Sequence, residues 1–376
     1  MRLLAAFAIG LALLAPLRPA SAFETLAPAA ILLDFPSGQV LFEKNADEPR
    51  PPASMSKLMT AFMVFDRLEE GTLSLDDTFF VSEKAWRMGG SKMFVEVGDR
   101  VRVEDLLRGT IIQSGNDACI VIAEGFAGSE EAFAETMNAR AAEIGLTNSN
   151  FANATGWPDP AHRMSVRDLG ILAHELIRRF PEHYHYYGER SFTYAGIEQG
   201  SRNPLLQAGI EGVDGLKTGH TSEAGYGLVA SAERDGRRLV LVVAGLETPG
   251  ERRREAERLL EYGFRNFQYY PLFAAGEPIE EAGVWFGDRA RVPLVAAETV
   301  AVTMHAQERD SLRVRVVYDA PLAAPIDAGT EVGELIIEAN GIDERRVPLL
   351  VAEDVGEANL FGRMWTAFRH LLGAAS

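Results

Sequence analysis

The stretch PASMSKLMT (residues 52–60) combines the start of a helix with two reactive side chains. Prolines at 51 and 52 disfavour helix immediately upstream, and the residues that follow have helical spacing as far as Glu70. Ser54 is therefore expected near the N-terminus of a helix, with Lys57 three residues later on the same face. The positive end of the helix dipole and the free backbone N–H groups favour developing negative charge at this position.

A serine hydroxyl is a poor nucleophile until a base removes its proton. Lys57 can be that base only if burial or a neighbouring cation lowers its pKa. The pair alone is a weak signal, because a serine that caps a helix close to a surface lysine is a commoner arrangement. Other motifs in the chain have to decide between the two interpretations.

A second motif, Ser114-Gly115-Asn116, lies between two stretches with helical patterns. The Ser114 hydroxyl can relay a proton, and the Asn116 amide can hydrogen-bond the backbone of a peptide substrate. By itself the motif is also compatible with an ordinary turn.

A third motif, Lys217-Thr218-Gly219-His220, precedes a strand-like run. On an edge strand it would provide a second cation near Lys57, a hydroxyl for a substrate carboxylate, and a glycine that leaves room for close backbone approach. A polar hairpin edge is the ordinary alternative. The three ordinary explanations do not account for the ordered set, which is characteristic of β-lactamases and penicillin-binding proteins.

Around these motifs, residues 24–270 alternate helical patterns with short apolar runs, which predicts an α/β (α+β) region. The patterns predict a hairpin of residues 31–35 with 39–43 and a capped helix at 129–145. They also predict a strand pair, 226–233 with 238–246, joined at Asp235-Gly236, and a last helix at 251–267. Beyond residue 270 the chain has only short strand-like runs separated by turns, at 300–305, 312–318, 333–338 and 345–351. We therefore predict a catalytic domain at 23–270 and a small all-β domain at 271–358.

The N-terminus predicts export. Arg2, an apolar run from Leu3 to Ala15 and a small-residue pattern at 20–22 are typical of a signal peptide, which assigns residues 1–22 to a cleaved segment. The run is too short to span a bilayer comfortably, which argues against a retained anchor.

The composition excludes several classes of function. The net charge is −17, and losing Arg2 and Arg18 with the signal peptide brings it to about −19, which disfavours a nucleic-acid partner. Cys119 is the single cysteine, so the chain has no intrachain disulfide. The seven histidines are scattered without a metal-ligand spacing, and we expect neither a metal nor a cofactor.

The tail at 359–376 has its apolar residues on one helical face, including Trp365 and Phe368. This pattern favours an amphipathic helix lying in a membrane surface over a helix docked on the β domain. With the signal peptide, it predicts a peripheral protein on the periplasmic face of the cytoplasmic membrane.

The sequence resembles the low-molecular-mass penicillin-binding proteins, the serine-type D-alanyl-D-alanine carboxypeptidases. Besides the three motifs, the resemblance includes the following stretches: 33–34, 91–94, 114–118, 153–158 with His162, 212–221 and 284–287. It extends over nearly the whole mature chain, and it implies a β-lactamase/transpeptidase-like antiparallel sheet flanked by helices.

The resemblance also implies roles for individual residues. Ser54 would form the acyl-enzyme, Lys57 would be the base and Ser114 would shuttle protons. Asn116 would hold the substrate amide, and Lys217, Thr218 and an arginine would bind the terminal carboxylate. The backbone N–H groups of Ser54 and His220 would form the oxyanion hole. For the arginine the candidate is Arg254, although a solvated face of the 252–254 arginine run explains it equally well.

The implied activity is removal of the terminal D-alanine from peptidoglycan stem peptides, with β-lactams as covalent inhibitors. Cleavage of cross-links by the same site is a close alternative that the motifs do not separate. A β-lactamase is disfavoured, because no Glu-x-x-Leu-Asn pattern lies between Asn116 and Lys217 to activate the deacylating water. A non-catalytic peptidoglycan-binding module is disfavoured because the reactive side chains are intact.

Overall fold

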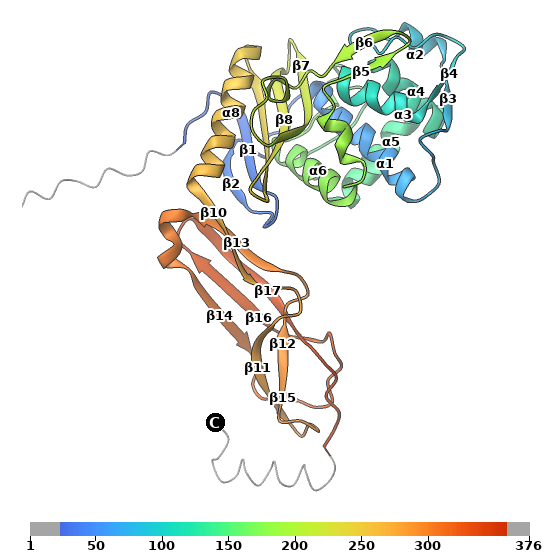
Figure 1. Ribbon diagram of the computed structural model, residues 1–376. Coiled ribbons are helices and arrows are strands. Elements are labelled where there is room, and N and C mark those ends of the chain that lie inside the picture. The colour runs from blue at the N-terminus through green and yellow to red at the C-terminus, as the bar shows by residue number, and fades with distance from the viewer. Residues whose placement is uncertain (1–22, 359–376) are drawn as a thin grey trace, which may run out of the picture.

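The computed structural model describes residues 23–358 (Figure 1). A five-stranded antiparallel sheet in the order β2-β1-β9-β8-β7 forms the centre of the N-terminal region. Its strands are β1 (Ala29–Asp34), β2 (Val40–Lys44), β7 (Val213–Thr221), β8 (Gly225–Arg234) and β9 (Arg237–Leu246). The predicted hairpin at β1–β2 is confirmed, and so is the β8–β9 turn, where Asp235 and Gly236 both have positive φ.

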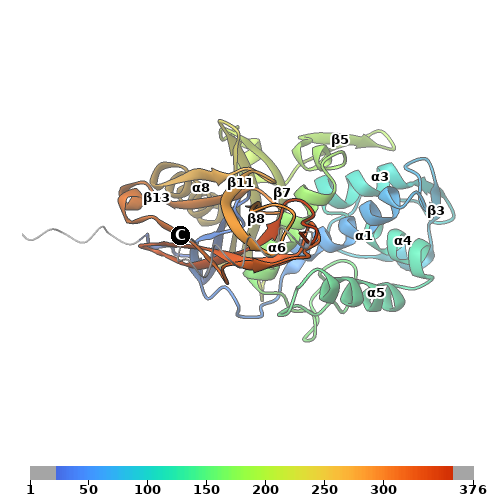
Figure 2. The same ribbon diagram turned by 90° about the horizontal axis from the view of Figure 1, so that it is seen from below.

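Helices cover both faces of this sheet, because its strands are apolar on both sides. The helix α8 (Pro249–Asn266) packs through Ala256, Leu259 and Leu260 against one face. Six other helices and the larger core lie on the opposite side, as Figures 1 and 2 show. These helices are α1 (Lys57–Glu69), α2 (Glu83–Arg87), α3 (Val103–Arg108), α4 (Asn116–Ala127), α5 (Glu130–Glu143) and α6 (Val166–Arg179). The short helix α7 (Pro204–Gln207) instead packs its Leu205 into the core on the α8 side.

Two pairs of short strands complete this region: β3 (Thr78–Phe80) with β4 (Arg100–Arg102), and β5 (Ser191–Tyr194) with β6 (Ile197–Gly200). The cap of α5 is as predicted, since Ser129 Oγ accepts the N–H of Ala132, and Gly145 with φ +82 follows the helix end. The helix α6 was not predicted from the sequence, although Ser165 caps it in the same way.

The C-terminal region is built from strands, as predicted (Figure 1). It contains a two-stranded sheet, β10-β13, and a six-stranded sheet in the order β14-β16-β17-β12-β11-β15. The strands are β10 (Phe267–Phe273), β11 (Pro278–Trp285), β12 (Arg291–Val295), β13 (Val300–His305), β14 (Arg313–Tyr318), β15 (Leu322–Ala323), β16 (Glu331–Ala339) and β17 (Ile342–Val351).

The two regions meet at a buried carboxylate. Asp34, at the end of β1, is fully buried and accepts hydrogen bonds from the Thr303 hydroxyl at 2.7 Å and from Arg237 Nε at 2.8 Å. Ser37 donates to the same carboxylate. Because Thr303 lies on β13, this network joins the C-terminal region to the central sheet.

No helix within residues 23–358 is long and apolar enough to cross a membrane. The predicted signal peptide at 1–22 and the predicted amphipathic helix at 359–376 lie outside the described residues.

Candidate active site

Ser54 and Lys57 form the centre of the site. Ser54 lies in a 3₁₀ turn (Ala53–Ser56), and Lys57 is the first residue of α1. Lys57 Nζ donates to Ser54 Oγ at 2.9 Å, so the two side chains are within reach, as their spacing predicted. Lys57 is only 1% exposed, whereas Ser54 is half-buried. A buried amine therefore contacts a serine that remains accessible.

The environment of Lys57 suits a base. Its ammonium also donates to Asn116 Oδ1 at 2.8 Å and to the carbonyl of Thr155. Burial, with a smaller contribution from the nearby charge of Arg202, lowers the pKa of Lys57 from 10.5 to about 8. About a tenth of the molecules then carry a neutral Lys57 at pH 7. Neutral Lys57 can therefore accept a proton near neutral pH without the help of another group.

Two glycines allow neighbouring segments to approach the Ser54 turn. A Cβ at Gly219 on β7 would lie 2.7 Å from the carbonyl oxygen of Pro52 and 3.0 Å from the Met55 side chain. At Gly156, where φ is +75, a Cβ would overlap the carbonyl of Ala53. The sequence predicted that Gly219 makes room for close approach to a ligand; in the structure its close neighbour is the turn that carries Ser54.

Asn116, the first residue of α4, contacts Lys57, and Ser114 lies two residues before it. Ser114 is buried and has left-handed backbone geometry with φ +65, directly after the π-helical turn Gly109–Gln113. Asn116 bridges two elements, because its Oδ1 accepts from Lys57 while its Nδ2 donates to the Gly89 carbonyl at 2.8 Å. The second motif is therefore part of the same site as the first.

Asp117 fixes the loop that faces Asn116. Its buried carboxylate accepts the backbone N–H groups of Met93, Phe94, Val95 and Ala118 at 2.9–3.3 Å. These bonds hold residues 93–95 against the start of α4. The resemblance at 91–94 and 114–118 thus corresponds to one hydrogen-bonded unit beside the site.

The third motif contributes a buried cation, Lys217, to the site. Lys217 on β7 is 2% exposed, and burial lowers its pKa well below 10.5, with further lowering by Lys57, Arg202 and Arg252. Thr218 is the next residue and is buried as well. None of the carboxylates within residues 23–358 forms an ion pair with Lys217, Arg202 or Arg252, so this side of the site can accept an anion.

Arg252 lies next to the aromatic stack that His220 of the third motif forms with Tyr226. The ring of His220 stacks on Tyr226 with centroids 3.8 Å apart, and the Arg252 guanidinium lies 5.5 Å from the Tyr226 centroid. Its Nε is buried, and no group in the described part of the chain accepts its proton. Burial lowers the pKa of Arg252.

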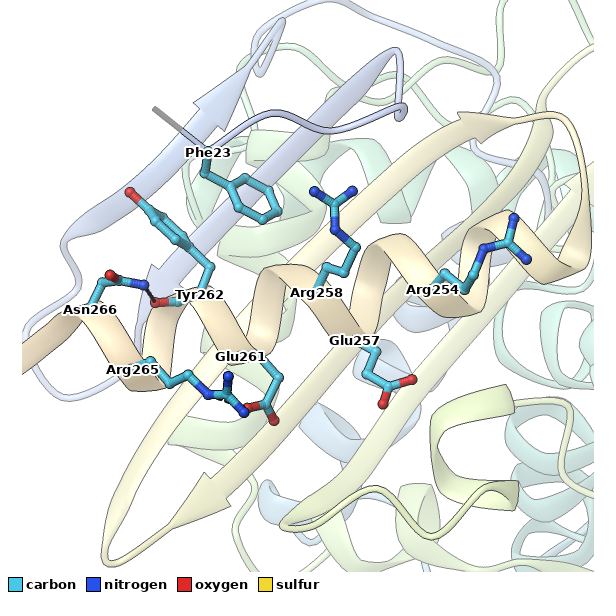
Figure 3. A pocket seen from close by; sticks show the side chains of 8 residues that line it. All are labelled: Phe23, Arg254, Glu257, Arg258, Glu261, Tyr262, Arg265 and Asn266. Carbon is cyan, nitrogen blue, oxygen red and sulfur yellow. Dashed lines mark hydrogen bonds and ion pairs between the residues drawn. The ribbon is translucent and has the colours of Figure 1, made fainter. Parts of the chain in front are cut away.

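The structure does not bring Arg254 to this place. Arg254 is exposed and lines a surface groove along α8, where Figure 3 shows it with Phe23 and Glu257. Positions i and i+2 of an α-helix are separated by about 200° around its axis, so Arg252 and Arg254 face different sides of α8. Arg252, and not the sequence candidate Arg254, therefore lies near the third motif, and Arg202 is a second cation close to Lys217.

Sequence reasoning missed Thr155, Arg202, Arg252 and the hydrogen-bonding role of Asp117. Thr155 acts through its backbone, which no side-chain pattern can indicate. For Arg202 a weak signal existed, since Asn203-Pro204 is a good helix start, and Asn203 indeed caps α7 and donates to the carbonyl of Gly215 on β7 at 2.8 Å.

Two further features bear on other kinds of chemistry. Cys119 is fully buried in α4, and burial raises the pKa of its thiol. Within residues 23–358 no three His, Cys, Asp or Glu side chains are grouped as a metal site would require.

Comparison with known proteins identifies the family. A family model described as D-alanyl-D-alanine carboxypeptidase matches residues 17–248, and a model for the penicillin-binding protein 5 C-terminal domain matches residues 267–357. The D-alanyl-D-alanine carboxypeptidase DacC of Escherichia coli (strain K12) is 41% identical over 346 residues, which is 90% of this chain and 86% of that protein.

Solved structures agree with this. The crystal structure of penicillin binding protein 5 from Haemophilus influenzae superposes with a TM-score of 0.86 at 38% identity, covering 90% of this chain and 100% of the other. Penicillin-Binding Protein D2 from Listeria monocytogenes in the ampicillin-bound form superposes with a TM-score of 0.60 at 32% identity, covering 66% of this chain and 100% of the other.

Proposed function

This chain belongs to the D-alanyl-D-alanine carboxypeptidase family of serine hydrolases, and on that basis we propose which of its residues carry out the reaction. Ser54 is the nucleophile and Lys57 the base. The observation that supports this most directly is the 2.9 Å contact between Ser54 Oγ and a lysine whose pKa burial lowers to about 8.

Acylation starts when neutral Lys57 takes the proton of Ser54 and Oγ attacks the carbonyl carbon of the penultimate D-alanine. The oxyanion is stabilised by the backbone N–H groups of Ser54 and His220, each worth about 3 kcal/mol in comparable sites. Ser114 relays the proton from protonated Lys57 to the leaving nitrogen, so that Lys57 is neutral again, the peptide C–N bond breaks, and D-alanine departs. Water then hydrolyses the ester on Ser54.

Substrate binding uses the groups on both sides of Ser54. Asn116 binds the substrate amide preceding the scissile bond. Lys217, Thr218 and Arg252 bind the terminal carboxylate, and Arg202 adds positive charge. This assignment is supported by the cations that lack carboxylate partners there and by the buried Nε of Arg252.

The partners follow from the same chemistry. Stem peptides of peptidoglycan are the substrates, and β-lactams acylate Ser54, as the ampicillin-bound relative suggests. Three further proposals rest on sequence patterns. The chain is exported and loses residues 1–22, and the mature protein is divided into domains at 23–270 and 271–358. Residues 359–376 attach it to the outer face of the cytoplasmic membrane.

The experiment is labelling with a fluorescent penicillin together with mass spectrometry of muropeptides. Ser54→Ala is expected to abolish labelling, while Ser74→Ala, an exposed serine after α1, leaves it unchanged. Wild-type protein is expected to shorten pentapeptide stems by one alanine. Labelling of Ser54→Ala would overturn the nucleophile, and loss of cross-linked dimers without trimming would favour the endopeptidase alternative.

Deleting residues 359–376 tests attachment separately. We expect the truncated protein to move from the membrane fraction to the soluble fraction while keeping penicillin labelling. Unchanged fractionation would contradict the membrane-surface helix.

A further inference from the structure

The three hydrogen bonds of Lys57 decide the direction of its lone pair. As an ammonium group it donates to Ser54 Oγ, to Asn116 Oδ1 and to the Thr155 carbonyl. Neutral Lys57 has two N–H groups, and carbonyl and amide oxygens can only accept them, whereas the serine hydroxyl can donate. The Asn116 oxygen is fixed, because its Nδ2 donates to the Gly89 carbonyl. The two N–H groups therefore stay on Asn116 and Thr155, and the lone pair is left for Ser54.

The position of the Thr155 carbonyl depends on the residue before it. Ala154 is fully buried, and its carbonyl accepts from the Thr60 hydroxyl at 2.7 Å, while its N–H donates to Glu130 Oε1 at 3.1 Å. Thr60 lies about one turn after Lys57 on α1, so the first bond joins the loop to the helix of the base. The second bond joins the loop to α5, whose first residue is Glu130.

Glu130 is more buried than its other contacts require. The start of a helix favours a negative charge, and Glu130 Oε2 lies 3.1 Å from Lys84 Nζ, yet its side chain is only 13% exposed. Glu131 is the next residue of α5 and has the same partner at 3.3 Å, but its side chain is 76% exposed. Within residues 23–358, the loop hydrogen-bonds Glu130 and not Glu131. The contact with Ala154 is therefore what distinguishes the two acids.

The rest of the loop has anchors of its own. Asn138 of α5 exchanges two hydrogen bonds of 2.8 Å with the backbone of Phe151, and Asn153 Oδ1 accepts the N–H of Gly156 at 2.8 Å. Loss of the Glu130 contact is therefore expected to displace the carbonyl that faces the base without unfolding the loop.

The charge of Glu130 has a second, opposite effect on the base. Burial is the main cause of the lowered pKa of Lys57, and the negative charge of Glu130 acts against it. Removing that charge lowers the pKa of Lys57 further, so more neutral base is present at a given pH below the pKa. Other titratable or charged groups interact with Lys57 from α4, the loop before α6, the segment before α7 and β7: Asp117, Cys119, His162, Arg202 and Lys217.

We propose that Glu130 is a positioning residue, which holds the Thr155 carbonyl against Lys57. It acts through Ala154, and the result is a lone pair directed at the Ser54 hydroxyl. Glu130 itself hydrogen-bonds neither Ser54 nor Lys57 in the described part of the chain. This inference rests on the proposed function, because it takes Lys57 as the base.

The test is the rate constant of acylation by a fluorescent penicillin, measured from about pH 6 to about pH 10. The rate constant is taken from the time course relative to its own final amplitude, so that unfolded molecules do not contribute. Two substitutions separate the two effects of Glu130, and the same substitutions at Glu131, which shares the ion pair with Lys84, are the controls.

Glu130→Asp keeps the charge but draws the carboxylate back by one methylene from the Ala154 N–H. Its limiting rate at high pH is expected to fall about tenfold, with the midpoint of the profile near that of wild type. Glu130→Gln keeps an acceptor oxygen for Ala154, while the exposed Lys84 turns to Glu131 or water. Its limiting rate is expected to stay within about twofold of wild type, with the midpoint moved to lower pH. Glu131→Asp and Glu131→Gln are expected to keep both quantities.

Equal limiting rates for wild type and Glu130→Asp would overturn the positioning role. A limiting rate of Glu130→Gln as low as that of Glu130→Asp would also overturn it, because the acceptor oxygen would then make no difference. Both results leave the proposed function standing if the wild-type rate rises with pH and Lys57→Ala is slow. A flat wild-type profile would instead count against Lys57 as the base, before any Glu130 variant is compared.

Discussion

The N-terminal and C-terminal regions differ in what they bury. The region up to and including α8 buries two lysines, three aspartates, a glutamate, a histidine and several hydroxyl and amide groups. Within residues 267–358, Thr303 is the one polar side chain among the buried residues, and it contacts Asp34 of the other region. The remaining core of the C-terminal region is aliphatic, with residues such as Leu294, Leu335 and Leu349.

This difference indicates that the N-terminal region contains the candidate reactive groups, whereas the C-terminal region has a supporting role. Burying a charge costs free energy unless hydrogen bonds or opposite charges compensate, so buried lysines without carboxylate partners are not expected in a region selected for stability alone. Lys57 and Lys217 are such lysines. The C-terminal region has none, and we expect its substitutions to change stability without changing the reaction.

The largest effect is expected from removing the buried base. Lys57→Ala should slow acylation by penicillin by about 10²–10⁴-fold, because within residues 23–358 no other basic side chain hydrogen-bonds Ser54. The measurement is the rate of fluorescent labelling, with Lys44→Ala on β2 as the control. Labelling at the wild-type rate would refute the role of Lys57.

The next largest effect is expected at Asp117. Asp117→Ala leaves four backbone N–H groups without their acceptor, which should lower the free energy of unfolding by about 2–4 kcal/mol. Urea unfolding monitored by loss of penicillin labelling measures it. Asp319→Ala, an exposed aspartate of the C-terminal region, should change the midpoint little. Equal midpoints for the two variants would contradict the contrast between the regions.

The pH dependence is a smaller effect. Because neutral Lys57 is the proposed base and its pKa is about 8, the acylation rate should rise about tenfold from pH 7 to pH 9 and then level off. Arg202→Ala removes a charge that lowers this pKa, so its profile should shift to higher pH, whereas Arg202→Lys should shift less. A flat profile between pH 7 and pH 9 would contradict this assignment.

The smallest effect is expected where the two regions meet. Thr303→Val removes one hydrogen bond to Asp34, while Arg237 and Ser37 still bind the carboxylate. The cost should be about 1 kcal/mol of stability, with an unchanged rate of penicillin acylation. Thermal unfolding with and without penicillin measures both, and Thr330→Val is the control. A slower acylation would show that the C-terminal region influences the site.

Local patterns predicted much of this architecture. The hairpin β1–β2, the β8–β9 turn, the cap of α5 and the strands at 300–351 depend on residues close together in the chain, and all are confirmed. The helix α6 escaped prediction although its cap and apolar face were present. The predicted helix start at Ser54 also needs refinement, since Ser54 lies in the 3₁₀ turn before α1.

By itself, the sequence determined the reactive side chains and their order, because Ser54 and Lys57 are related by a helical spacing and the other two motifs are short. Only the tertiary structure decided which groups surround them. Arg252 rather than Arg254 faces the third motif, the Thr155 carbonyl contacts Lys57, and Trp157 flanks Asn116. These neighbours come from distant segments, and helix rotation and long-range packing, which no local pattern encodes, bring them together.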